Sequence, residues 1–119
     1  MTQPIQDSFV LHQGATFART YRWVRDGVPV NLTGAQIRSQ FRLTIGSAVP
    51  VLDLTTENGG ISIDDAAEGT FTLRASAIKT ASIPAGVRRT LVMDVEVVLN
   101  GEVTRLIEAE PVLSPEVTR

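Results

Sequence analysis

The sequence predicts an all-β protein, an antiparallel sandwich or a closed, barrel-like sheet of about seven to eight strands with one short helical turn. Three observations lead to this fold class. Apolar and polar residues alternate with a period of two along most of the 119 residues, as they do in half-buried strands. Glycine, proline, asparagine and aspartate recur between these segments, where they favour turns. No segment has the apolar periodicity of a long helix.

The first half of the chain contains the two clearest strands. Residues 16–25 alternate, and the side chains expected to point inward are Phe17, Tyr21 and Trp23. Residues 35–45 alternate more strictly, and their apolar set is Ala35, Ile37, Phe41, Leu43 and Ile45. Turns are expected at 26–27 and 31–34. Pro29 makes the segment between these turns a bend or an edge, because proline cannot donate to a central ladder.

The second half continues with shorter strands, which are predicted at 51–54, 61–63 and 70–75. In the last of these, the side chains expected to point inward are Phe71, Leu73 and Ala75. Ser76 is a suitable N-cap for a single helical turn over 77–81. Pro84 and Gly86 are expected to end that turn.

A β-hairpin is predicted around Asn100-Gly101, because this pair favours a two-residue turn with positive φ at both positions. Such a turn fixes a register in which Glu96 faces Arg105 and Val95 faces Leu106. The side chains on the core face are then Met93, Val95, Val97, Leu99 and Leu106. The apolar side chains on the outer face are Val92, Val98, Val103 and Ile107, around a polar group of Asp94, Glu96 and Arg105. An outer face this apolar indicates a surface covered by another element or by a partner chain.

The length predicts one domain, with residues 1–8 as an N-terminal arm, 9–113 as the β-sandwich and 114–119 as a C-terminal tail. Both terminal segments are polar, interrupted by proline and without periodicity. Two interpretations of them stay open. They are fraying ends, or they are arms that become ordered against neighbouring subunits.

Composition limits the classes of function. A formal charge of −2 argues against a general nucleic-acid binder, and the absence of cysteine excludes disulfides and thiolate metal sites. No apolar run reaches the roughly 18–20 residues of a membrane span, and residues 1–7 lack the features of a signal peptide. We expect no cofactor, no nucleic-acid partner and no membrane partner, in a protein kept or assembled in the cytoplasm.

The reactive side chains predict a protein that is not an enzyme. His12 is the only histidine and therefore the only ready general base. Asp64, Asp65 and Glu68 crowd one turn, and a Ca²⁺ site there is the alternative to an ordinary acidic turn. Their spacing matches no EF-hand loop.

Two further groups of charges have both a structural and a functional interpretation. Asp94 and Glu96 have the spacing of an acid/base pair, but Arg105 offers Glu96 an exposed cross-strand partner. Arg22, Arg38 and Arg42 lie on predicted polar strand faces. They are solubilising charges, or they form a stripe that docks on an acidic partner, since the planar guanidinium suits carboxylates.

Several segments together resemble a known group of proteins, and they are 13–17, 26–35, 37–42, 68–73, 80–86 and the hairpin running into 112–118. The chain resembles the small immunoglobulin-like β-sandwich proteins of tailed bacteriophages. Within that group it is similar to the N-terminal domain of baseplate upper proteins and to small tail or head-to-tail accessory proteins. It departs at Leu91-Val92-Met93, where related chains have a Tyr-x-Tyr pattern, and at Ala109 and Glu110, where a glycine is common.

The resemblance implies an immunoglobulin-like sandwich and a structural role without catalytic residues. The expected function is a virion subunit of the tail, baseplate or fibre attachment, present in several copies and assembled in the cytoplasm of the bacterial host. Its expected partners are other virion proteins. A capsid decoration protein and a carbohydrate-binding or adhesion module on the same scaffold are the alternatives. The residues expected to contact partners are Arg22, Arg38, Arg42, Val92, Val98, Val103 and Ile107.

Overall fold

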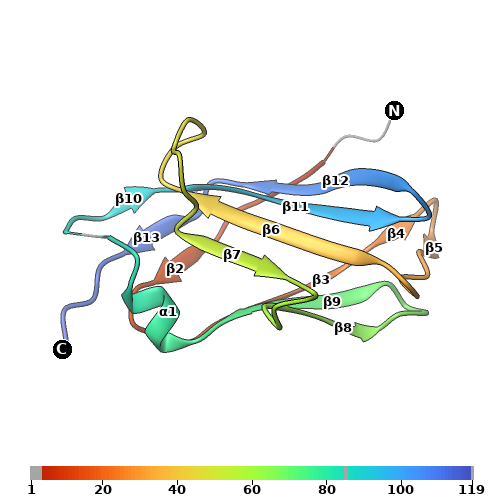
Figure 1. Cartoon of the computed structure of the whole chain (residues 1–119), viewed down its shortest axis with the longest axis horizontal. Helices are drawn as coiled ribbons and strands as arrows, with labels where there is room; N and C mark the ends of the chain where they lie inside the picture. Colours follow the sequence, from red (N-terminus) through yellow and green to blue (C-terminus); the bar gives the residue numbers. More distant parts are fainter. Residues whose placement is uncertain (1–3, 85, 119) are drawn as a thin grey trace.

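The computed structural model describes residues 4–84 and 86–118 and shows the predicted all-β, sandwich-like fold (Figure 1). One layer is a sheet whose strands, in spatial order, are β1 (Ile5–Asp7), β12 (Glu102–Ala109), β11 (Val92–Leu99), β6 (Gln36–Arg42) and β7 (Leu52–Thr55). The strands of the other layer, in spatial order, are β3 (Phe17–Arg22), β9 (Thr70–Ala75) and β8 (Ile61–Asp65).

Shorter elements lie at the two ends of the long axis, which measures 43 Å (Figure 1). At one end is a third sheet formed by β10 (Arg89–Thr90), β13 (Val112–Ser114) and β2 (Val10–His12). Beside it lies α1 (Ala77–Ala81), which Ser76 caps by accepting a hydrogen bond from the backbone N–H of Lys79, as predicted. At the other end, β4 (Val24–Arg25) and β5 (Val28–Pro29) form a two-stranded ribbon, so that Pro29 lies in an edge strand.

The strands are more numerous than the sequence predicts, and not all are antiparallel. The described residues form thirteen strands, of which six have only two or three residues. Two pairs are parallel, namely β1 with β12 and β2 with β13. The segment that begins the described chain therefore runs alongside the last hairpin strand and its continuation, in the same direction. These short pairs lack the alternation that identifies a strand in a sequence.

The core joins the two layers through aromatic contacts. Phe17 of β3 meets Phe41 of β6 edge to face, with ring centroids 5.9 Å apart. Phe9 stacks on Phe17 at 5.7 Å. Edge-to-face and offset geometries are the favourable ones for aromatic pairs. Phe71 and Trp23 are also buried, as predicted, so the alternation identified the core face of both layers. Ile45 is the exception, because β6 ends at Arg42 and leaves Ile45 exposed.

A β-bulge changes the predicted register of the hairpin. The Asn100-Gly101 turn forms, with positive φ at both residues, and Glu96 pairs with Arg105 as predicted. Beyond this point Val95 pairs with Ile107 instead of Leu106, because Leu106 is an extra residue in β12. Leu106 and Ile107 are consequently both buried, so the placement of Ile107 on the outer face is wrong.

The expected N-terminal arm over residues 1–8 is wrong for its described part, while residues 1–3 lie outside the described residues. Residues 5–7 form β1, and the carboxylate of Asp7 joins the two layers. It accepts two hydrogen bonds from Arg19, at 2.7 and 2.8 Å, and one from the hydroxyl of Tyr21, at 2.7 Å. Arg19 and Tyr21 belong to β3 in the opposite layer. The Arg19 guanidinium also lies 4.6 Å from the ring centroid of Phe9.

The expected C-terminal tail over 114–119 is likewise held at its start, whereas residue 119 lies outside the described residues. Ser114 belongs to β13, and its carbonyl accepts a hydrogen bond from the backbone N–H of Gln13 at 3.0 Å. The backbone N–H of Glu116 donates to the side-chain oxygen of Gln13 at 2.9 Å. The tail therefore continues along the turn that follows β2.

Replacing Asp7 with asparagine tests the connection between the layers. Hydrogen bonds from Arg19, with further ones from Tyr21 and the Ser8 backbone, lower the pKa of Asp7 to about 2, against the opposing effect of burial. Because the folded-state pKa is lower than the unfolded one, the ionised carboxylate stabilises the fold above about pH 4. This stabilisation is lost as the pH falls towards 2. We expect Asp7→Asn to lower the free energy of unfolding at pH 7 by about 1–2 kcal/mol.

Urea unfolding between pH 7 and pH 2 measures this effect. The difference between the parent protein and Asp7→Asn should shrink as the solution becomes acidic. Asp53→Asn is the matched control, because the Asp53 carboxylate is exposed and accepts no hydrogen bond within residues 4–84 and 86–118. A difference that stays constant with pH would contradict the assignment.

Gly69 holds the β4–β5 ribbon against the sandwich. Its carbonyl accepts a hydrogen bond from the backbone N–H of Trp23 at 2.9 Å, and the Trp23 carbonyl accepts one from the backbone N–H of Val30. With φ of +71°, a Cβ at position 69 would lie 2.6 Å from the Trp23 carbonyl oxygen. Gly34 has a similar φ of +81°, but a Cβ at that position would have no neighbouring atom within 4 Å.

Comparing Gly69→Ala with Gly34→Ala separates backbone strain from this close contact. Both substitutions carry the cost of a left-handed φ, about 1–2 kcal/mol. Gly69→Ala should cost about 1–3 kcal/mol more, because the backbone must shift to make room. Thermal unfolding measures both values, and equal losses would show that the contact with Trp23 relaxes freely.

Candidate functional site

The outer face of the five-stranded sheet carries two adjacent rows of polar side chains. The register aligns one row across all five strands, and it consists of Gln6, Glu108, Asp94, Gln40 and Asp53. The next row consists of Arg105, Glu96, Arg38 and Thr55. We call the charged and amide residues of these rows the charged face, which comprises Gln6, Arg38, Gln40, Asp53, Asp94, Glu96, Arg105 and Glu108.

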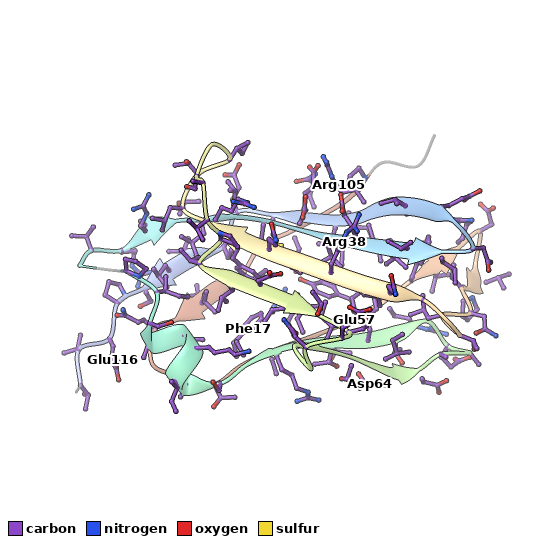
Figure 2. All side chains as sticks on the ribbon, viewed as in Figure 1. Phe17, Arg38, Glu57, Asp64, Arg105 and Glu116 are labelled. Atoms are coloured by element: carbon purple, nitrogen blue, oxygen red, sulfur yellow. The ribbon has the colours of Figure 1, made fainter. Side chains whose placement is uncertain are left out.

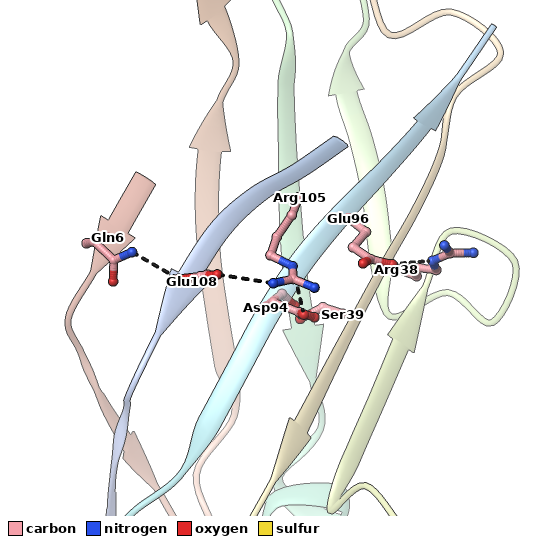
Figure 3. Close-up of polar contacts among 7 residues, drawn as sticks. All are labelled: Gln6, Arg38, Ser39, Asp94, Glu96, Arg105 and Glu108. Atoms are coloured by element: carbon pink, nitrogen blue, oxygen red, sulfur yellow. Dashed lines mark hydrogen bonds and ion pairs between the residues drawn. The ribbon is translucent and has the colours of Figure 1, made fainter. Parts of the chain in front are cut away.

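Ion pairs connect the rows (Figure 3). Arg105 lies between two carboxylates, 3.6 Å from Asp94 and 3.4 Å from Glu108. Arg38 pairs with Glu96 at 2.9 Å. The predicted register of Glu96 and Arg105 is therefore right, but the predicted ion pair between them is replaced by one from the neighbouring strand. These side chains are partly exposed, and such pairs contribute little to stability.

The β-bulge is what makes this arrangement possible. In a regular strand, residues three apart point to opposite faces. The extra residue Leu106 places Arg105 and Glu108 on the same outer face of β12. Glu108 also accepts a hydrogen bond from the side chain of Gln6 at 3.0 Å, which extends the network to the edge strand β1.

The electrostatics of the charged face leave one carboxylate poorly compensated. Burial raises the pKa of Asp94, and the nearby charge of Glu96 raises it further, while Arg105 and Arg38 act in the opposite direction. Hydrogen bonding by Gln6, supported by Arg105, lowers the pKa of Glu108. An additional positive charge near Asp94 would therefore stabilise its ionised form.

Apolar side chains border the charged face on both sides. Val98 pairs with Val103 next to the hairpin turn, and Val103 is exposed. At the opposite margin Val92 pairs with Arg42. The loop after β6 continues this margin, with Ile45 and Val49 among the exposed apolar residues.

Polar bonds hold that loop in shape. Arg42 donates to the Ser47 carbonyl at 2.8 Å and to the side chain of Gln40 at 2.7 Å. The hydroxyl of Ser47 accepts a hydrogen bond from the Thr44 N–H at 3.0 Å. The exposed apolar residues therefore project from an ordered base.

Three hollows open on this side of the molecule, with volumes of about 370, 440 and 740 Å³. The first lies between the loop and β12, and its lining includes Ile45, Asp94 and Glu108. The second lies between β11 and β7, and the third lies beside Val103. Residues of the charged face line all three hollows. The face is therefore uneven, and the hollows offer space for side chains of a partner.

The structure brings together five of the seven residues predicted to contact partners. Arg38, Arg42, Val92, Val98 and Val103 share the outer side of the five-stranded sheet. Arg22 lies on β3 in the other layer, where it pairs with Glu68 at 2.9 Å, so the predicted arginine stripe does not form. Arg105 takes the place of Arg22 beside Arg38, on the same layer and away from Asp64 (Figure 2). Ile107 is in the core.

Most of the other candidate residues have structural partners. Asp64 accepts hydrogen bonds from Thr72 and Ser62. In the part of the chain that the structure describes, no group of three or more histidine, aspartate or glutamate side chains could hold a metal ion. All six aromatic side chains lie in the core or pack against it, and Trp23 is covered by Arg25. His12 is exposed at the end of β2.

Replacing Arg105 tests the network. Arg105→Met keeps most of the side-chain length but removes the charge that lies between Asp94 and Glu108. Since Arg105 opposes the effects of burial and of Glu96, its removal should raise the pKa of Asp94 further. Titration of the Asp94 carboxyl carbon by NMR measures this pKa. Arg74→Met, on the other layer, is the control, and an unchanged pKa in Arg105→Met would contradict the network.

None of the helices in the described residues is long and apolar enough to cross a membrane. A scan against models of known protein families found no match for this chain, and a search of curated proteins found none either.

Proposed function

We propose that the chain is a non-enzymatic structural subunit of a bacteriophage virion, an accessory of the tail, baseplate or fibre attachment that acts through protein–protein contacts. The observation that carries this proposal is the outer side of the five-stranded sheet. There, partly exposed ion pairs lie between two apolar margins on a rigid scaffold. The family resemblance of the turns and strands supports the same function, as an analogy of fold.

The energetics of the charged face favour a role in binding. Exposed ion pairs contribute about 0–1 kcal/mol each, so stability does not require so many charges on one sheet face. Charges arranged in this way interact more strongly when a partner excludes water from them and supplies complementary groups. The apolar margins at Val103 and Ile45 provide area whose burial drives association.

The terminal segments are not the surface that we propose for the contact with partners, because they are bound within the fold. Residues 5–7 are used within the sheet, and Asp7 is used between the layers. The start of the tail is bound to Gln13. The sheet face, rather than these segments, is therefore the surface we assign to virion partners.

Charge reversal at Asp53 tests the proposal in particles produced from the genome that encodes this chain. Asp53 is exposed, so Asp53→Lys should change the free energy of unfolding by no more than about 1 kcal/mol. It should reduce the amount of this chain in purified particles by about tenfold or more, because it reverses one of the carboxylate charges that the face presents to a partner. Quantitative mass spectrometry of the particles measures the amount, and separated heads and tails distinguish a tail subunit from a capsid decoration protein.

Arg74→Glu is the control, because it reverses an exposed charge on β9 in the other layer. It should be incorporated as the parent chain is. Absence of the parent chain from particles would contradict the proposed function. Equal incorporation of Asp53→Lys and Arg74→Glu would contradict the assignment of the charged face.

A further inference from the structure

A surface with the opposite charge lies at one end of the same molecule. It is formed by α1, by β10 and by residues 87–88 directly before β10, and α1 and β10 lie at the same end of the long axis (Figure 1). We call this surface the basic end, and it comprises Ile78, Lys79, Val87, Arg88 and Arg89.

The cations of the basic end have no ion-pair partner among the described residues. Lys79 and Arg88 are exposed, and the only side-chain hydrogen bond from Arg88 within that part of the chain is a long one of 3.4 Å to Ser114. The Nε of Arg89 is buried and has no hydrogen-bond partner there. An acidic group at this end is Glu116, which lies against Gly14 beside α1. Three cations and this one carboxylate give a formal charge of +2.

Apolar side chains accompany these charges. Ile78 on α1 is 83% exposed, and Val87 is 70% exposed. An exposed branched side chain next to an unpaired cation is a combination that the interior of the fold does not explain. Both kinds of group would lose water if a complementary surface covered them.

The charged face is that complementary surface. Its two arginines and four carboxylates give a formal charge of −2, opposite in sign to that of the basic end. It also has apolar margins at Val103 and at Ile45, and hollows between them. The two surfaces therefore have net charges of opposite sign, and each also exposes apolar side chains.

We infer that the basic end of one copy of this chain docks on the charged face of a second copy. The inference deepens the proposed function and rests on it, because it names the partner as another subunit of the same kind. In this contact Lys79 and Arg88 meet the carboxylates around Asp94, and Ile78 and Val87 meet the apolar margins. The two surfaces occupy different parts of the molecule, so the contact is heterologous and repeats into a ring or a filament.

Two complementary variants test this contact with the full chain. Lys79→Glu/Arg88→Glu reverses the charge of the basic end and leaves the charged face intact. Asp53→Lys/Glu108→Lys reverses the charge of the face and leaves the basic end intact. Each variant alone should associate at least about tenfold more weakly than the parent chain, because like charges then meet. An equimolar mixture should associate again, since the intact basic end of the second variant fits the intact face of the first.

Sedimentation velocity over a range of protein and salt concentrations measures the association. The parent chain should form oligomers as its concentration rises and dissociate as salt screens the charges. Arg74→Glu is the control and should associate as the parent does. A parent chain that stays monomeric at all concentrations, association that survives Lys79→Glu/Arg88→Glu, or a mixture that fails to associate would each overturn the inference.

The same measurements separate this inference from the proposed function. A strictly monomeric chain that is nevertheless found in purified particles overturns the contact between copies and leaves the virion function in place. A chain that associates as expected but is absent from particles overturns the virion function.

Discussion

The hydrogen-bonded carboxylate of Asp7 is the constraint on which the candidate site depends. It connects β1 in one layer with Arg19 and Tyr21 in the other, next to the aromatic contact between Phe17 and Phe41. Burial of that aromatic group supplies the larger share of the cohesion, but it does not fix where the edge strand lies. The ladder with β12 and the bidentate pair of Asp7 with Arg19, which has a defined geometry, together do so. β1 in turn supplies Gln6 to Glu108, so the edge of the charged face at β1 depends on this interaction.

The exposed ion pairs of the charged face contribute little to stability, but together with the β-bulge they determine where its charged side chains lie. A regular hairpin would place Arg105 and Glu108 on opposite sides of the sheet, and the bulge at Leu106 places them on one side. The bulge also buries both Leu106 and Ile107, which adds apolar area to the core. One extra residue therefore serves the core and the surface together. Bulges commonly redirect side chains near functional surfaces.

Local signals in the sequence predicted the fold class and most of the core. Ser76 before α1 and the Asn100-Gly101 turn are recognisable because a single residue type satisfies a backbone requirement there. Ile107 was placed on the wrong face, because the adjacent apolar residues Leu106 and Ile107 interrupt the alternation without showing that both are buried, which depends on packing across strands. The pairing of Asp7 with Arg19 could not be predicted from the sequence either, because it joins residues from two layers. The charged face was predicted in part, through Arg38, Arg42 and the outer valines, but Gln6 and Asp53 become part of it only through the strand order.

The parallel pairing of β1 with β12 and of β2 with β13 has a consequence for synthesis of the chain. Ile5 pairs with Ile107, and the hydrogen bond between Gln6 and Glu108 spans 102 residues of sequence. While the ribosome is still making the middle of the protein, β1 and β2 have no partners to pair with. Contacts between such distant residues also slow folding, because a long loop must close before they form. The sandwich is therefore completed only after translation of residues 102–114, and until then β1 and β2 stay without the strands that they pair with.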